Sequence, residues 1–216
     1  MNKIENSKWK ILPNILTIFR IVLTPFIIVL LFIDSKILYS FSWINSNTSV
    51  SITFLISGIL FLIACFSDFL DGYLARKNNW ISDFGKIWDP IADKVLTTSI
   101  YICFSLKNFI PFYFVLIMIT RDIVVDAYRQ TATKKGIVTP ANIWGKLKTI
   151  IQMLSIIAIY FIFNDSSALN FKATKIEYYF IQNILVMFAT ISSCFSWYVY
   201  VKQINKELKR VNYDKQ

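Results

Sequence analysis

The stretch Asp68–Asp93 reads D-F-L-D-G-Y-L-A-R-K-N-N-W-I-S-D-F-G-K-I-W-D-P-I-A-D, and the rest of the chain is best interpreted from it. Four of its carboxylates stand at helical spacings: Asp68, Asp71, Asp89 and Asp93. The stretch lies between two apolar runs that look like membrane helices. Charged side chains next to lipid are costly, so these carboxylates need a functional reason.

The spacing of the four carboxylates predicts that they converge. Asp68 and Asp71 are three residues apart and share a helix face, and Gly85, Asp89 and Asp93 share a face of the next helix. If the two faces meet, the like charges repel one another unless a cation lies among them. Oxygen ligands favour Mg²⁺, Mn²⁺ or Ca²⁺. A divalent ion held at a membrane surface indicates phosphate chemistry.

Each of these residues also has a plainer interpretation. A single Asp at a helix end is more often a cap than a ligand, but four at this spacing are not all caps. Gly72 could end a helix, or it could let a substrate approach the backbone closely. Ala75 and Gly85 could serve as helix-packing residues in the bilayer.

The composition is that of a membrane protein. The 216 residues are 56% hydrophobic with a mean hydropathy of +0.52, which is typical of one polytopic membrane domain. The absence of histidine excludes imidazole bases, His-ligated zinc and Ser-His nucleophiles. The three cysteines lie in apolar runs and indicate packing, not disulfides. A net charge of +10 favours anionic lipid headgroups or a phosphorylated substrate over nucleic acid.

The hydropathy pattern predicts an all-α integral membrane protein with six transmembrane helices and an amino-terminal interfacial helix. The expected spans are approximately 15–33, 50–67, 87–104, 109–120, 149–163 and 178–201, with a polar loop at 34–47. We expect an interfacial segment at 1–14, the six-helix domain at 15–201 and a basic tail at 202–216. Lys and Arg concentrate at the termini, in the motif loop and in 121–148, which places these parts in the cytoplasm.

A second cluster of charges, this one basic, lies between the fourth and fifth spans. It comprises Arg121, Arg129, Lys146 and Lys148. The two arginines are eight residues apart, about two helical turns, so one face can present both. The two lysines open the fifth helix, and a helix amino terminus with basic side chains is suited to binding phosphate. The plainer alternative is an ordinary cytoplasmic loop that obeys the positive-inside rule.

The carboxylate stretch resembles the signature of a known family. Its pattern, D-x2-D-G-x2-A-R-x8-G-x3-D-x3-D, is similar at every position to that of the CDP-alcohol phosphatidyltransferases. The resemblance implies transfer of a phosphatidyl group from CDP-diacylglycerol to an alcohol, with release of CMP, by a homodimer in a bacterial cell membrane. It implies Mg²⁺, or Mn²⁺, held by Asp68, Asp71, Asp89 and Asp93. Asp93 would also take the proton of the attacking hydroxyl; whether it ligates a second ion stays open. The implied CDP site comprises Gly72, Arg76, Ser82 and Gly85.

Three further stretches are similar to a branch of this family that uses glycerol 3-phosphate as the acceptor. They are P-N-I-L-T-I-F-R at 13–20, T-R-D-I-V-V-D-A-Y-R at 120–129 and W-G-K-L-K-T at 144–149. This resemblance implies that the basic cluster binds the acceptor phosphate and that Thr17 and Arg20 face the active cavity. Alternatively, Arg20 extends to the interface. Asp122 departs from the branch, which has Glu at that position.

Two other functions remain open at this point. One is a related transferase with another acceptor, such as inositol phosphate, serine or phosphatidylglycerol; the basic cluster favours a phosphorylated acceptor and so disfavours serine. The other is a cation transporter whose acidic cluster forms the ion path. A transporter would not need Arg76 and the glycines at fixed offsets from the carboxylates.

Overall fold

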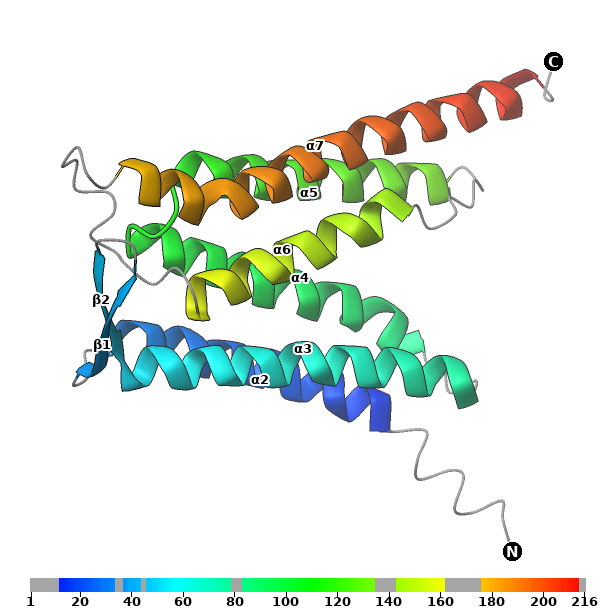
Figure 1. Cartoon of the computed structure of the whole chain (residues 1–216). Coiled ribbons are helices and arrows are strands. Elements are labelled where there is room, and N and C mark those ends of the chain that lie inside the picture. The colour runs from blue at the N-terminus through cyan, green and yellow to red at the C-terminus, as the bar shows by residue number, and fades with distance from the viewer. Residues whose placement is uncertain are drawn as a thin grey trace, which may run out of the picture. The chain divides into compact units, whose positions relative to one another are not determined.

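The computed structural model describes residues 12–33, 37–43, 46–78, 83–134, 143–161 and 176–213, and these are mostly helical. The described ranges contain six helices, which are labelled in Figure 1: α2 (Leu12–Phe32), α3 (Ile52–Asn78), α4 (Asp83–Leu106), α5 (Phe112–Lys134), α6 (Ile143–Phe161) and α7 (Ile176–Tyr213). The predicted interfacial segment at 1–14 lies almost wholly outside the described residues, since α2 begins at Leu12.

Four of the helices in the described ranges are long and apolar enough to cross a membrane: Asn14–Phe32, Ile52–Ala75, Ile143–Phe161 and Asn183–Glu207. Helices α4 and α5 are not among them. Each is roughly 35 Å long at 1.5 Å per residue, enough for a hydrocarbon core of about 30 Å. Their hydropathy is lowered by the charged residues of the predicted sites, such as Asp89 and Asp93 in α4 and Arg121 and Arg129 in α5. The helices therefore support a membrane protein, and six spans stay a prediction.

The predicted polar loop at 34–47 is wrong in its central part. Strands β1 (Ile37–Trp43) and β2 (Ser46–Ser51) form an antiparallel hairpin in which Tyr39 pairs with Val50 and Trp43 with Ser46. The sequence Y-S-F-S-W at 39–43 alternates aromatic residues with serine, and this period of two is a strand signal. The otherwise helical fold therefore carries one small sheet.

Helix α3 extends further than the predicted second span. It continues through the first half of the carboxylate stretch to Asn78, so Gly72 does not end a helix. The second half of the stretch lies in α4, which begins at Asp83. Asp68 and Asp71 are therefore on one helix, and Asp89 and Asp93 are on the next, as their spacing predicts.

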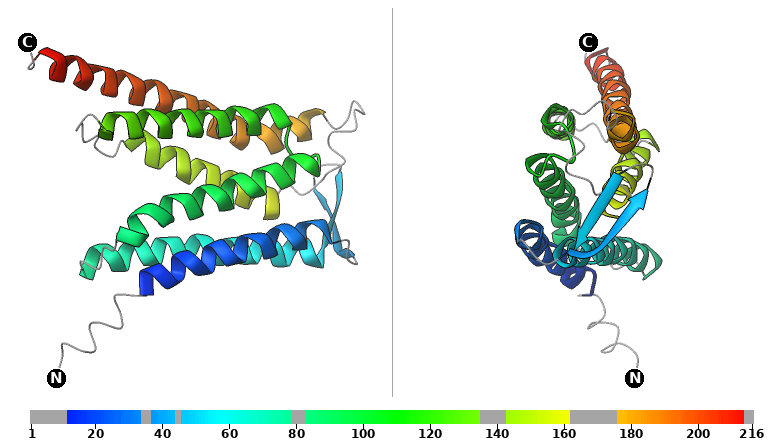
Figure 2. Two further views of the ribbon diagram at one scale, coloured as in Figure 1. Left: turned by 180° about the vertical axis from the view of Figure 1, so that it is seen from behind. Right: turned by 60° about the vertical axis from the view of Figure 1, so that its left-hand side comes forward.

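The chain divides into two compact units, which we describe separately. The first comprises 1–109 and 156–167, and the second comprises 110–155 and 168–216, so α6 contributes to both. In the first unit α2 packs against both α3 and α4, and Figure 2 shows α2 and α3 side by side. An aromatic cluster forms its core. The centre of the Tyr160 ring lies 5.0 Å from that of Phe54 and 4.9 Å from that of Phe104.

In the second unit α5 packs along α7. The buried residues of α5 are spaced by three, four or seven positions, which places them on one face, and they are Val115, Met118, Arg121, Val125 and Ala132. The facing residues of α7 follow the same spacing, with Ala189, Ser193, Ser196, Tyr200 and Ile204 all buried. This spacing is that of two helices packed along a continuous seam, and here the seam contains an arginine and two serines.

Candidate active site

The carboxylates of the first unit converge on one side chain of α2. Arg20 is completely buried, and its Nη1 donates to Asp68 Oδ1 at 2.7 Å. The same nitrogen contacts Asp93, and Nη2 contacts Asp71. Two carboxylates of α3 and one of α4 therefore share a single guanidinium. The alternative in which Arg20 extends to the membrane interface is wrong.

The fourth carboxylate is linked to the same face of α2. Thr17 lies three residues before Arg20, and its hydroxyl donates to Asp89. Positions three apart on a helix are neighbours on one face, so this short segment of α2 contacts both α3 and α4 through polar groups. Sequence reasoning placed Thr17 and Arg20 near the cavity only through a short resemblance and gave them no specific role.

Among the described side chains of this cluster, the charges do not balance. Four carboxylates and one guanidinium carry a formal charge of −3 (−4 and +1), and Asp71 is only 3% exposed. Burying unpaired charge next to lipid is costly. The arrangement therefore favours a further cation.

The chemical type of the acidic cluster's oxygen atoms suits a divalent metal ion. All are carboxylate oxygens, which hard cations such as Mg²⁺ prefer, and they already gather around a positive charge from two helices. In the described part of the chain, however, no three acidic, His or Cys side chains form a ready-made ligand group. A metal ion would share these carboxylates with Arg20.

The predicted CDP site is only partly described. Gly72 is half-buried in α3, and Gly85 is buried near the start of α4. Ser82 and the side chain of Arg76 lie outside the described residues. The four residues therefore stay a prediction.

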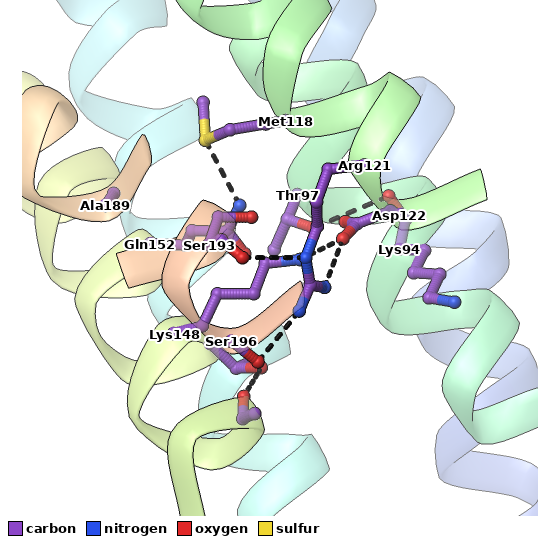
Figure 3. A network of polar contacts seen from close by, with 12 residues as sticks. Lys94, Thr97, Met118, Arg121, Asp122, Lys148, Gln152, Ala189, Ser193 and Ser196 are labelled. Carbon is purple, nitrogen blue, oxygen red and sulfur yellow. Dashed lines mark hydrogen bonds and ion pairs between the residues drawn. The ribbon is translucent and has the colours of Figure 1, made fainter. Parts of the chain in front are cut away.

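Two of the predicted acceptor-binding residues lie together in the second unit. Arg121 Nη1 donates to Asp122 Oδ1 at 2.8 Å, and Lys148 Nζ donates to the same oxygen (Figure 3). Arg121 and Lys148 are both largely buried. One turn further along α6, Gln152 Nε2 contacts the sulfur of Met118 at 3.2 Å. Asp122, noted in the sequence only as a departure, thus joins the two cations.

The other two predicted acceptor-binding residues are exposed. Arg129 is exposed on α5, and its Nη2 donates to the Tyr200 hydroxyl at 2.8 Å. Lys146 is exposed in the first turn of α6. The four basic residues therefore form a buried pair and an exposed pair.

Sequence reasoning missed the contribution of α7 to this network. Arg121 Nε donates to the main-chain oxygen of Ser193 at 2.9 Å, and its Nη2 donates to Ser196 Oγ at 2.8 Å. No motif covers this part of the chain. The only available signal was small polar residues at helical spacing within an apolar span.

Comparisons with known proteins identify the family of this chain. The sequence model of the family described as CDP-alcohol phosphatidyltransferase matches residues 10–201. The chain belongs to this family, whose members generally use a divalent metal ion.

Three curated bacterial relatives carry the same name, CDP-diacylglycerol--glycerol-3-phosphate 3-phosphatidyltransferase. The protein of Mycoplasma pneumoniae is 38% identical over 204 residues, covering 93% of this chain and 90% of its own. That of Mycoplasma genitalium is 36% identical over 206 residues, covering 94% and 87%. That of Bacillus subtilis is 34% identical over 151 residues, covering 68% and 75%.

Proposed function

We infer that this protein transfers the phosphatidyl group of CDP-diacylglycerol to sn-glycerol 3-phosphate, giving phosphatidylglycerophosphate and CMP. The observation that carries this inference is the similarity to relatives of that name over more than nine-tenths of the chain. The two clusters support it chemically. One gathers acidic groups suited to a metal-bound diphosphate, and the other gathers basic groups suited to a phosphorylated acceptor.

In the acidic cluster, Asp68, Asp71 and Asp89 would hold Mg²⁺, with Mn²⁺ as a substitute. When bound, the ion would neutralise negative charge on the oxygens of the diphosphate, which makes its phosphorus easier to attack. Asp93 takes the proton of the attacking hydroxyl, and its contact with Arg20 holds the carboxylate in one orientation. An Asp is a weak base, so its contribution depends on its position next to the reacting hydroxyl.

The two substrates would reach the site by different routes. The acyl chains of the donor stay in the bilayer while its cytidine diphosphate meets Gly72, Arg76, Ser82 and Gly85. Glycerol 3-phosphate is water-soluble, and the basic cluster attracts its phosphate. Arg121 and Lys148 then supply charge-assisted hydrogen bonds, and the exposed Arg129 and Lys146 add to the attraction.

We also propose the arrangement in the membrane. Six spans put both termini on one side, and the Lys and Arg of the termini and of 121–148 favour the cytoplasm for that side and for the active site. Helices α4 and α5 are long enough to complete the six. The protein would act as a homodimer in a bacterial cell membrane.

A panel of acceptors tests the reaction. The purified protein, in detergent micelles with Mg²⁺, is given cytidine-labelled CDP-diacylglycerol and one of glycerol 3-phosphate, inositol phosphate, serine or phosphatidylglycerol. We expect rapid CMP release only with glycerol 3-phosphate. Faster release with another acceptor would assign the chain to a related transferase, and release with none would contradict the proposal. Asp93→Asn serves as the inactive control.

A further inference from the structure

Helix α7 supplies partners for both arginines of the basic cluster. Ser196 Oγ and the main-chain oxygen of Ser193 bind the buried Arg121. One turn further along, the Tyr200 hydroxyl binds Arg129, whose guanidinium also lies 5.3 Å from the centre of the Tyr200 ring. Both arginines are therefore held from α7, and Arg121 is also held by Asp122 of its own helix.

These partners form one stripe on α7. Ser193, Ser196 and Tyr200 are spaced by three and four residues, which places them on a single helix face. They lie in a span of mean hydropathy 1.7, where apolar residues would be the default, and both serines are completely buried. Serine is small enough to let two helices approach and still offers an oxygen to a buried donor. The stripe therefore matches the arginines of α5 in position and in chemistry.

The contacts restrict how the guanidinium of Arg121 can lie. Arg121 is only 9% exposed, and a buried guanidinium is costly unless its N–H groups are bonded. Nε, Nη1 and Nη2 each donate to a protein acceptor, so the guanidinium plane is held in one orientation. Arginine binds phosphate through a planar fork, and its contribution depends on that plane.

We propose that Ser196 and Tyr200 are positioning residues of the acceptor site, which orient the guanidinium groups of Arg121 and Arg129 toward the acceptor phosphate. The proposal rests on the proposed function, because it takes the basic cluster as the phosphate site. Without the Ser196 hydroxyl, Nη2 of Arg121 loses its acceptor and the group can rotate. Acceptor binding then weakens, whereas donor binding and the rate at saturating acceptor do not change.

Two small substitutions test the proposal, each with a matched control on α7. We expect Ser196→Ala to raise the KM for glycerol 3-phosphate about three- to tenfold, the effect of one hydrogen bond. Tyr200→Phe keeps the ring and should raise it about twofold. Two control variants should leave the KM for glycerol 3-phosphate unchanged. Ser192→Ala removes a hydroxyl that donates to the main-chain oxygen of Ala189 within α7. Tyr198→Phe changes a side chain that is 62% exposed. An unchanged acceptor KM in Ser196→Ala, or an equal rise in the KM for CDP-diacylglycerol, would overturn the proposal.

A double variant tests whether Ser196 acts through Arg121. Adding Ser196→Ala to Arg121→Lys should change the acceptor KM no further, because lysine has no fork to orient. Effects that simply multiply would contradict this role. Calorimetric titration with inorganic phosphate gives a readout that does not need turnover. A wild-type protein that binds phosphate but releases no CMP would contradict the proposed function alone, whereas equal phosphate affinity in Ser196→Ala would contradict the positioning role alone.

Discussion

The acidic cluster of the first unit and the basic cluster of the second share one arrangement with opposite signs of charge. In the first, Arg20 contacts Asp68, Asp71 and Asp93. In the second, Asp122 contacts Arg121 and Lys148. A single residue of the opposite sign thus holds like charges together, and each cluster keeps an excess charge. The excess is negative where a metal ion is expected and positive where a phosphate is expected.

The two central residues differ in burial. The Arg20 side chain is 0% exposed, whereas the Asp122 side chain is 19% exposed. Charge–charge contacts weaken as water reaches them, and an exposed group that loses its partner can be solvated instead. The first cluster should therefore tolerate loss of its central residue, Arg20, much less well than the second tolerates loss of Asp122.

The largest effect is expected from removing Arg20. Arg20→Met leaves three carboxylates without their common partner, and breaking a buried ion pair costs about 3–5 kcal/mol of stability. We expect a lower unfolding temperature in detergent micelles and no measurable CMP release. Arg20→Lys keeps the charge and should recover part of the stability. Wild-type stability and turnover in Arg20→Met would show that the cluster does not depend on this residue.

Asp93→Asn should affect catalysis but, unlike Arg20→Met, should not lower stability. The amide has nearly the same shape but cannot take the proton of the attacking hydroxyl, so turnover should fall by orders of magnitude while the unfolding temperature stays near that of the wild type. CMP release and thermal unfolding, measured on one preparation, separate the two effects. Near-normal release would refute the role of Asp93 as the base.

In the basic cluster, Lys148→Ala should mainly weaken binding of the acceptor. Asp122 keeps Arg121 as a partner, so the fold survives, but one charged donor to the phosphate is lost. We expect the KM for glycerol 3-phosphate to rise about ten- to a hundredfold, the usual range for a hydrogen bond to a charged group. Steady-state kinetics at saturating CDP-diacylglycerol measure this. An unchanged acceptor KM would remove Lys148 from the site.

The smallest effects are expected at two glycines, one in each unit. A Cβ at Gly58 would lie 3.0 Å from the Tyr160 ring and 3.3 Å from Phe161, so Gly58→Ala should destabilise the first unit by about 1 kcal/mol through overpacking. A Cβ at Gly145 would lie 4.0 Å from both Ser196 and Tyr200, an ordinary contact. Gly145→Ala should therefore be neutral or slightly stabilising in thermal unfolding. A larger loss of stability in Gly145→Ala than in Gly58→Ala would contradict the packing described around these two glycines.

The sequence predicted the helices and the acidic residues better than it predicted their partners. Asp68, Asp71, Asp89 and Asp93 could be found because their helical spacing is local and their motif is specific. That Arg20 contacts three of them could not be deduced, since it depends on how α2 packs against α3 and α4.

The basic cluster shows the same limit. Arg121 and Lys148 were found from local patterns, but the contribution of α7 was not, because Ser193 and Ser196 lie more than seventy residues from Arg121 in the chain. The hairpin at 37–51 was missed for another reason: its polar composition masked the alternation that marks a strand.

The central claim is that acidic side chains from α3 and α4, gathered on Arg20, hold a divalent ion that phosphatidyl transfer requires. The most direct measurement is the initial rate of CMP release against free Mg²⁺, for the wild type and for Asp71→Asn, at fixed CDP-diacylglycerol and glycerol 3-phosphate. We predict no release without the ion, and a requirement shifted to higher Mg²⁺ concentrations in the variant. Release that persists in a chelator, or identical Mg²⁺ curves for the two proteins, would contradict the account.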